Sequence, residues 1–355
     1  MKIPKSLILD LYTDYLIAGV SQTTATGFAL VLNNQITHDM VTRLLSSGFI
    51  SSQRLWSMVK PICEEIEDEN GVLIIDDSIE AKPYTDCNEL ICWHFDHTVN
   101  RSVKGVNFVS AIYDNWKMSL PIGVCFVKKD VNYINKEGKT KRKSSISKQE
   151  HFRTLVKHGT EHLRFRYVLA DSWFACSENM KFVLEDYGRD FIMSMKENRK
   201  VALSKQDKAK GKYISIKEAV SEKCVRSVYV EQLDFPILIA KQVFKDGNGV
   251  TGTLYLACSD LSLSYEQITT IYQRRWKVEE YHKSIKSNTA FPKSPTRTVM
   301  TQQSHFIASI MAYVKLERLK IRCSKNHFAL KSLMLANATK AAWCTMQKLT
   351  DLKVA

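Results

Sequence analysis

Two short apolar runs, each followed directly by aspartate, place the strongest constraint on the fold of this chain. Residues 72–75 read Val-Leu-Ile-Ile and lead into Asp76 and Asp77, and residues 167–170 read Tyr-Val-Leu-Ala and lead into Asp171. Short apolar runs that stop at acids are typical of strands buried on both faces of a sheet. Since strand ends lie side by side in a mixed sheet, we expect Asp76 and Asp171 to converge.

The order of the expected elements indicates an α/β (α+β) fold with a mixed sheet. A hairpin follows the first apolar run, and a helix leads from the hairpin to the second run. The expected elements are strand 72–75, hairpin strands 107–113 and 120–128, helix 147–158, strand 167–170, helix 178–187 and strand 191–195.

Changes in composition divide the chain into five expected regions. They are a helical N-terminal region (1–68), the first part of the core (69–199), a β-rich insertion (200–260), the remaining core with its helices (261–322) and a helical tail (323–355). In the first region, amphipathic stretches at 38–46 and 53–67 fit a helix-turn-helix that reads DNA. They also fit an ordinary helical hairpin, which is a common motif.

The charge of the chain restricts its partner. The formal net charge is +14 and the pI is about 9.2, which favours an anionic partner such as nucleic acid or a membrane surface. Nothing approaches about eighteen consecutive apolar residues, so no membrane-spanning helix is expected. Asp10 and Asp14 interrupt the apolar N-terminus, which argues against a secretory signal. The nine scattered cysteines are typical of reduced thiols in a cytoplasmic protein.

The stretch 271–286 has a two-sided pattern. Read as one helix at about 100° per residue, it places apolar side chains on one face and charged and aromatic side chains on the other. The apolar face comprises Ile271, Val278, Tyr281 and Ile285, and the opposite face comprises Tyr272, Arg275, Glu279, Lys283 and Lys286. A carboxylate among cations suits a metal-assisted site that also grips a polyanion. An exposed helix with favourable charge pairs is the plain alternative.

Asp76, Asp171 and Glu279 together predict a metal site. Three carboxylates brought together repel one another, and a divalent cation relieves this repulsion. Ligation by oxygen alone suits Mg²⁺ or Mn²⁺ better than zinc. Two such ions can activate a water or a 3′-hydroxyl for in-line displacement at phosphorus. The alternative is that each aspartate merely caps a strand or a helix.

The order of these elements and the spacing of these residues resemble those of a known protein family. The order strand, hairpin, helix, strand, with acids at two strand ends, resembles the RNase H-like core of DDE transposases. A Y-(2)-R-(3)-E-(6)-K signature, typical of the insertion-sequence-four type of bacterial transposase, is matched in full by Tyr272, Arg275, Glu279 and Lys286. The segments Asp-Asp-Ser-Ile-Glu-Ala-Lys and Arg-Trp-Lys-Val-Glu-Glu-Tyr-His-Lys-Ser look closest to the related group numbered seven hundred and one.

The resemblance implies roles for single residues. Asp76, Asp171 and Glu279 would be the catalytic triad and would bind two metal ions. The cations and the aromatic of the same helix would hold DNA phosphates, and they are Tyr272, Arg275, Lys283 and Lys286. Asp77 is the competing candidate for the first acid. Asp76 is favoured because the family pattern places one residue between the acid and a hydroxyl, here Ser78.

By the same resemblance, the chain is similar to transposases that act on double-stranded DNA. Such an enzyme binds inverted-repeat ends, hydrolyses one strand and directs the freed 3′-hydroxyl onto target DNA, and it is expected to work as a homodimer on DNA and to associate with the nucleoid. In some members of the family a tryptophan of the insertion stacks on a flipped base during hairpin formation. Residues 200–260 lack tryptophan, so either another aromatic such as Tyr229 or Phe244 stacks there, or the reaction uses a different intermediate. An RNase H-like metal nuclease, an inactive copy and a non-catalytic DNA-binding protein are the alternatives.

Residues 128–157 form a basic segment, with ten Lys or Arg against three acids. Its centre comprises Lys141, Arg142 and Lys143. We expect this segment to contact the DNA backbone without regard to sequence, although a solvated loop is the usual reason for such a run.

The sequence favours neither a zinc site nor a nucleotide site. Cys87, Cys92, His94 and His97 lie close together in the sequence, but their spacing is not that of a zinc finger, and buried cysteines with a hydrogen-bonded histidine are favoured. No glycine-rich phosphate loop occurs, so no nucleotide cofactor is expected.

Overall fold

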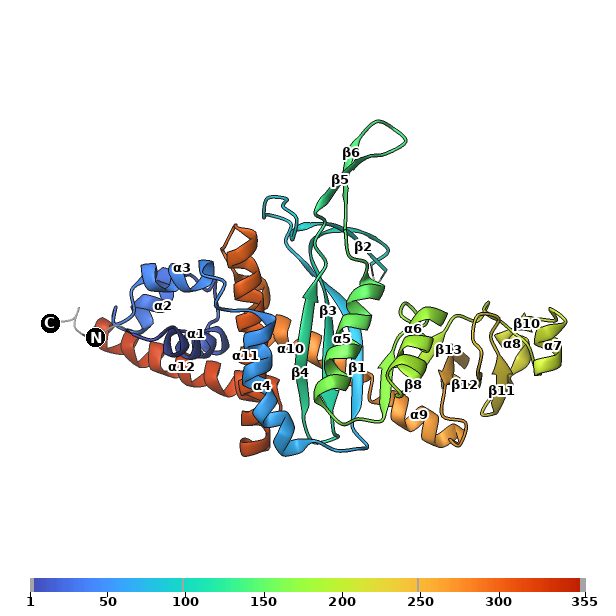
Figure 1. Ribbon diagram of the computed structural model, residues 1–355. Coiled ribbons are helices and arrows are strands. Elements are labelled where there is room, and N and C mark those ends of the chain that lie inside the picture. The colour runs from blue at the N-terminus through green and yellow to red at the C-terminus, as the bar shows by residue number, and fades with distance from the viewer. Residues whose placement is uncertain (1–2, 98, 248, 352–355) are drawn as a thin grey trace. The chain divides into compact units, whose positions relative to one another are not determined.

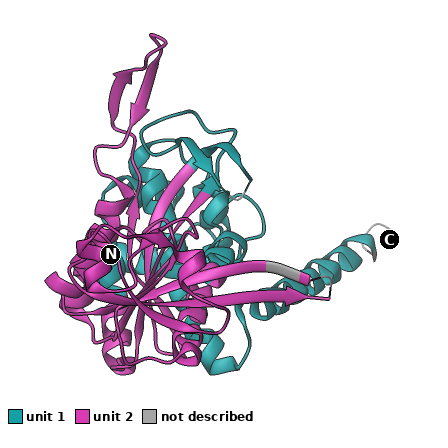
Figure 2. Cartoon of the chain, turned by 90° about the vertical axis from the view of Figure 1, so that its right-hand side faces the viewer, with its two compact units in different colours: residues 1–58, 80–105, 281–355 teal, residues 59–79, 106–280 magenta. Residues whose placement is uncertain are grey.

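The structure, a computed structural model, describes residues 3–97, 99–247 and 249–351 (Figure 1). The chain separates into two compact units, each built from several segments (Figure 2). Unit 1 comprises residues 1–58, 80–105 and 281–355, and unit 2 comprises residues 59–79 and 106–280. Each unit is described by itself below.

A mixed sheet forms the centre of unit 2. Its strand order is β11-β12-β13-β8-β7-β1-β3, and β4 pairs with β3. β7 runs parallel to both of its neighbours, β1 and β8, whereas the pairs β11–β12, β12–β13, β13–β8 and β3–β4 are antiparallel. The strands are β1 (Val72–Ala81), β3 (Arg101–Asp114), β4 (Ser119–Phe126), β7 (Tyr167–Ala170), β8 (Asp190–Met195), β11 (Val225–Tyr229), β12 (Pro236–Asp246) and β13 (Gly249–Cys258).

This architecture confirms the expected fold class. Unit 2 is a mixed α/β sheet with a parallel centre, consistent with an RNase H-like core, and helices form both the N-terminal and the C-terminal parts of the chain. Residues 72–75 and 167–170 are at most 4% exposed, as buried strands require. The strands β11, β12 and β13 of the β-rich region join the same sheet, because β13 pairs with β8.

Helix α5 (Lys148–His162) covers part of this sheet. Ser147 caps it, and Glu150 completes a capping box, which explains why the helix begins where the sequence predicts. A Cβ on Gly159 would lie 2.7 Å from Leu73 of β1, so glycine allows the helix to approach the strand closely.

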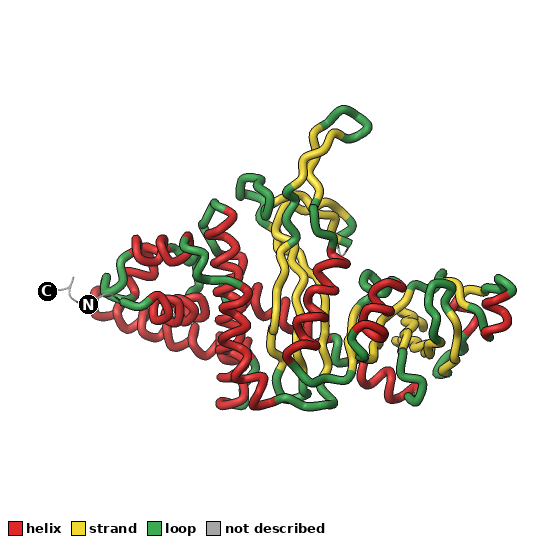
Figure 3. The backbone as a smooth tube through the Cα atoms, in the orientation of Figure 1, coloured by secondary structure: helices red, strands yellow, loops and turns green. Residues whose placement is uncertain are grey.

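Shorter elements complete unit 2 (Figure 3). The expected helix 178–187 is α6 followed by a turn of π-helix, and the basic segment forms a hairpin of two strands. The remaining elements are β5 (Val131–Ile134), β6 (Thr140–Lys143), α6 (Ser177–Lys181), η1 (Phe182–Asp186), β9 (Lys200–Val201), α7 (Lys205–Ala209), β10 (Ile214–Ser215), α8 (Ile216–Ala219) and α9 (Tyr265–Gln273).

Helices make up most of unit 1. N-terminal helices pack against C-terminal ones: Tyr12 Oη lies 3.0 Å from His305 Nδ1, and Lys331 Nζ donates to Gly19 O over 2.9 Å. The elements are α1 (Lys5–Ala18), α2 (Ala25–Val31), α3 (His38–Ser46), β2 (Cys92–Asp96), η2 (Phe291–Lys293), α11 (Val299–Cys323) and α12 (His327–Asp351). Two further helices, α4 (Ser52–Ile66) and α10 (Trp276–Asn288), contain residues of both units. In the described ranges no helix is long and apolar enough to cross a membrane.

Candidate active site

Asp76 and Asp171 lie at neighbouring positions of the unit 2 sheet. The parallel pairing of β1 with β7 ends at Ile75 and Ala170, and each aspartate is the next residue of its chain segment. The sequence predicted that the first strand ends at Asp76, and this was wrong, because β1 continues to Ala81 beside its other neighbour, β3. The convergence of the two acids therefore depends on where β7 ends.

The two aspartates share an electrostatically unfavourable environment. Burial, and then the charge of Asp171, raise the pKa of Asp76 to about 8, while Arg275 and the Asp77 N–H act in the opposite direction. Burial also raises the pKa of Asp171, although its Oδ1 accepts the Trp173 N–H over 3.0 Å. A positive charge placed between these carboxylates would stabilise both.

Asp77, the competing candidate, has a partner of its own. Its Oδ2 lies 2.5 Å from Lys148 Nζ, and both side chains are about one-fifth exposed. Lys148 is the first residue of α5, and its ammonium also lies 5.5 Å from the centre of the Trp173 ring. Sequence reasoning missed Lys148, whose only signal was its place directly after the Ser147 cap.

Residues 272–286, expected as one helix, are interrupted. Helix α9 ends at Gln273 and α10 begins at Trp276. Around the break, Arg274 N–H donates to Ile271 O and Arg275 N–H donates to Tyr272 O, which are tighter turns than those of an α-helix. The helical wheel used on the sequence therefore loses its phase at this point.

Arg274 explains the break. Its side chain is 3% exposed, its Nε donates to Asp114 Oδ2 over 2.8 Å and its Nη1 donates to Asn70 O over 2.9 Å. The guanidinium also lies 4.4 Å from the centre of the Trp116 ring. The side chain thus anchors the turn between α9 and α10 to Asp114 and Asn70. Sequence reasoning assigned Arg274 to neither face of the helix.

Arg275, the next residue, connects two of the expected acids. Its Nη1 lies 3.6 Å from Asp76 Oδ2, and its Nη2 donates to Glu279 Oε1. Tyr272 lies beneath this guanidinium, with its ring centre 5.8 Å away. Tyr272 is 7% exposed and its hydroxyl donates to Ala170 O, so it is buried instead of standing on an open polar face.

The expected phosphate-binding lysines beyond Glu279 belong to unit 1. Lys286 Nζ lies 3.7 Å from Glu80 Oε2 and is 30% exposed. Lys283 is exposed, and its ammonium lies 5.3 Å from the centre of the Phe328 ring. Three of the four residues of the expected apolar face, Val278, Tyr281 and Ile285, are fully buried. The fourth, Ile271, is only half-buried.

The basic segment projects as the hairpin β5–β6. Lys141, Arg142 and Lys143 form strand β6, and every residue of β6 is exposed. Lys143 Nζ lies 5.8 Å from the centre of the Tyr133 ring on β5. The hairpin therefore presents its cations to solvent on a small, folded support.

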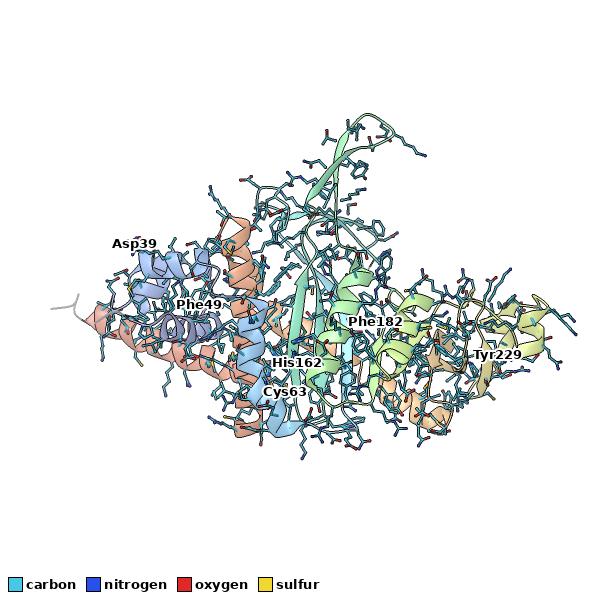
Figure 4. All side chains as sticks on the ribbon, in the orientation of Figure 1. Asp39, Phe49, Cys63, His162, Phe182 and Tyr229 are labelled. Carbon is cyan, nitrogen blue, oxygen red and sulfur yellow. The ribbon has the colours of Figure 1, made fainter. Side chains whose placement is uncertain are left out.

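A cavity of about 520 Å³ lies beside Arg275. Phe244, which is 47% exposed, and Trp276, which is 60% exposed, contribute to its lining together with Tyr272. Tyr229, the other aromatic considered from the sequence, lies on β11 (Figure 4) and does not line this cavity.

The chemistry of the two aspartates fits a divalent cation, but the third ligand is engaged elsewhere. Among the described residues, no group of three or more His, Cys, Asp or Glu is arranged to hold a metal ion. Asp76 and Asp171 offer partly buried oxygen donors, and the charge of Asp171 raises the pKa of Asp76, as expected where Mg²⁺ binds between carboxylates. Glu279 pairs with Arg275, so its carboxylate would have to leave this guanidinium to join them.

The described cysteines and histidines near residue 92 do not form a zinc site either. Cys92 Sγ lies 3.2 Å from His94 Nε2, which is a hydrogen-bonding contact between neighbours on β2. Within the described ranges, these residues do not belong to a cluster of three possible metal ligands.

Two family models match the chain. The model described as "DDE superfamily endonuclease" matches residues 7–217, which is more than half of the chain. The model described as "Transposase DDE domain" matches residues 140–315, a range that contains Asp171, Arg275 and Glu279. A search of curated proteins finds no match.

Proposed function

The chain belongs to the DDE superfamily of endonucleases, and we propose that it is a transposase of the insertion-sequence-four type. It would bind double-stranded DNA at the inverted-repeat ends of its element, cut one strand and join the freed 3′-hydroxyl to target DNA. The observation that carries this proposal is the pairing of Arg275 with both Asp76 and Glu279, beside Asp171. It gathers acids and a phosphate-binding cation in one place.

In this proposal, Asp76, Asp171 and Glu279 hold two Mg²⁺ or Mn²⁺ ions. Enzymes with this domain typically use divalent metals, and the mutual repulsion of the two aspartates supports such a site. When bound, the ions supply Lewis acidity to the scissile phosphate and lower the pKa of the attacking water or 3′-hydroxyl. Asp76 is proposed over Asp77 because Lys148 already neutralises the Asp77 carboxylate.

The cations around the acids would hold DNA phosphates. Arg275 is only 17% exposed and has a planar fork suited to a phosphate. On this view Arg275 keeps Glu279 in place until DNA arrives, and then exchanges the carboxylate for a phosphate. Lys283 and Lys286 would act as further point charges.

The cavity beside Arg275 supports a stacking role for an aromatic. Phe244 and Trp276 both line it and are about half exposed, so either ring can receive an unpaired base. Of the two aromatics first considered, Phe244 is therefore proposed over Tyr229. A homodimer on DNA follows from the chemistry of joining two ends, which requires both ends to be held together.

The proposal is tested by the change Glu279→Gln. The substrate is a supercoiled plasmid that carries the DNA flanking the coding sequence, and the reading is Mg²⁺-dependent cleavage and joining. Loss of this carboxylate should lower cleavage at least about a hundredfold while DNA binding persists, because the missing contact acts in the reaction. The matched control is Glu280→Gln, since Glu280 follows on the same helix, is 57% exposed and pairs only with Lys277.

Each outcome of this assay bears on a separate statement. If the wild-type protein binds DNA but shows no metal-dependent cleavage, the proposed enzyme activity is excluded and the protein is a non-catalytic DNA-binding protein. Nicks without joined products would favour a metal nuclease. Asp76→Asn and Asp77→Asn compare the two candidate acids: the larger loss should belong to Asp76, and the reverse order would reassign the metal ligand.

A further inference from the structure

A second, polar cavity lies at the edge of the sheet that carries Asp171. Its volume is about 230 Å³. One wall is the segment after β7, with Trp173, and the other is the segment after β8, with Lys196 and Arg199. Because β7 and β8 are adjacent and parallel, the two segments leave the same edge of the sheet, where ligands bind in sheets of this type. We call this cavity the Trp173 pocket.

The wall that carries Trp173 is held by several hydrogen bonds. Asp171 Oδ1 accepts the Trp173 N–H over 3.0 Å, and Gln149 Nε2 of α5 donates to Trp173 O over 2.8 Å. Asn179, which is fully buried, donates to Phe174 O over 2.9 Å. The segment therefore keeps its shape without a ligand, and a ligand need not pay for ordering it.

The other wall carries two cations that lack an acidic partner. Arg199 Nη2 donates to Ser177 Oγ over 3.2 Å, which is a contact to a neutral hydroxyl. For Lys196 and Arg199, the described part of the chain offers no carboxylate within 4.0 Å. The pKa of the nearby Glu178 carboxyl is lowered first by its own backbone N–H and in smaller part by the charge of Arg199, but no ion pair joins these two described residues. Two positive charges without a directly paired carboxylate at one cavity favour an anionic ligand.

Two cations nearer the acids are engaged in ion pairs. Arg275 pairs with Asp76 and Glu279, and Lys148 pairs with Asp77. A DNA phosphate in the Trp173 pocket would meet Lys196 and Arg199 without displacing a carboxylate from an ion pair. In strand order, β1 carries the first aspartate, the segment after β7 begins with the second, and the segment after β8 carries the two cations.

Trp173 adds an apolar surface to this charge. Its side chain is 45% exposed, although the Lys148 ammonium lies 5.5 Å from the ring centre. An indole beside cations is the combination that binds a nucleotide, because phosphate pairs with the cations and the sugar or base packs on the ring. The cavity is smaller than the roughly 300–1,000 Å³ of a typical ligand pocket, so it has room for one such group and not for a base pair.

We propose that the Trp173 pocket binds a backbone phosphate of the DNA, with Lys196 and Arg199 on the phosphate and Trp173 against the adjoining sugar or base. The proposal rests on the proposed function, since it takes DNA as the substrate. It adds a phosphate position that is separate from the one assigned to Arg275.

The salt dependence of DNA binding tests this proposal. The probe is a duplex cut from the plasmid used above, and the reading is the slope of log affinity against log salt concentration. Lys196→Gln and Arg199→Gln should each lower the slope by about one unit, and the double variant by about two. Arg199→Lys keeps the charge and should keep the slope. Lys205→Gln is the matched control, because Lys205 is an exposed lysine of unit 2 outside the pocket.

A variant of Trp173 distinguishes the contribution of stacking from that of the two cations. Trp173→Ala should weaken binding about tenfold at every salt concentration and leave the slope unchanged, because stacking releases no counterions. Circular dichroism checks that each variant is folded.

The outcomes distinguish the pocket from the proposed function. Wild-type protein that binds and cleaves DNA, with a double variant of unchanged slope, would overturn the pocket alone. An equal loss of slope in Lys205→Gln would also overturn it, since the effect would then be one of net charge. Wild-type protein that binds no DNA overturns both.

Discussion

Arg274 shows how a single residue can set the geometry of the candidate site. Its guanidinium is buried against Asp114, and its neighbour Arg275 reaches the acids. A buried charge is tolerable only while its partner remains, because the alternative is an unpaired ion in a poorly solvated place. The break between α9 and α10, and with it the direction of Arg275 and Glu279, therefore depends on this pair.

Removing one member of the buried pair should be costly. Arg274→Gln leaves Asp114 without its ion partner, so the free energy of unfolding should fall by about 3–5 kcal/mol in denaturant titrations. The matched control is Lys277→Gln, whose ion pair with Glu280 is about half exposed and should contribute no more than about 1 kcal/mol. A loss no larger than that of the control would remove Arg274 as the anchor of the break.

The sequence predicts some residues of the candidate site and does not indicate others, for a physical reason. Asp76 and Asp171 were found because an apolar run before each acid marks a buried strand, and neighbouring strands bring their ends together. Lys148 and Arg274 were missed because a cation in a sequence is usually on the surface. Their partners, Asp77 and Asp114, are distant in the sequence, and pairing of this kind leaves no local pattern.

At the scale of elements, the hairpin β5–β6 carries its positive charge on exposed side chains. Its strand β6 is fully exposed, so its cations contribute little to stability, and nothing prevents them from facing DNA. The sequence predicts the charge of this segment and a loop, whereas the structure has a hairpin of two strands. The paired strands arise from Asn135, whose side-chain oxygen accepts the backbone N–H groups of Glu137 and Lys139 and closes the turn.

Neutralising β6 should lower the salt dependence of DNA binding. The change replaces Lys141, Arg142 and Lys143 with Gln, and the slope of log affinity against log salt should fall by up to about three units. The comparison is a triple Gln variant at Lys60, Lys205 and Lys277, which removes the same charge elsewhere. Identical slopes for the two variants would mean that the hairpin acts only through net charge.

The failed prediction of a single helix belongs to the same scale. A periodicity argument assumes that each residue advances the helix by the same angle, and one buried side chain is enough to violate it. Strand β1 gave a similar error, since its last residues are partly exposed and lack the apolar pattern of residues 72–75. Pairing to a neighbouring strand, and not hydrophobicity, keeps that segment extended.

At the scale of the whole molecule, two buried histidines make unit 1 sensitive to acid. Burial lowers the pKa of His305 to about 4 and that of His327 to about 4, so both imidazoles are neutral in the folded unit at neutral pH. The His305 ring lies 3.0 Å from both Tyr12 Oη and Ala290 O. In the unfolded chain both histidines return to a pKa near 6.5.

The stability of unit 1 should fall as the pH falls from about 6.5 to about 4. In this window the unfolded chain binds more protons than the folded unit, which shifts the equilibrium towards unfolding. His305→Gln should reduce stability at pH 7.5 but flatten its decline, as measured by thermal unfolding across this range. Replacement of His38, which is exposed on α3, is the control. An unaltered pH dependence in His305→Gln would show that this ring does not carry the effect.

The make-up of the two units has a consequence for the order in which they can form on the ribosome. Unit 2 ends at residue 280, whereas unit 1 needs residues 281–355 as well as its first segment. Helix α1 finds its partners His305 and Lys331 only after synthesis has passed residue 331. Since a domain folds when its last segment emerges, unit 2 is completed first, while the N-terminal helices wait for α11 and α12.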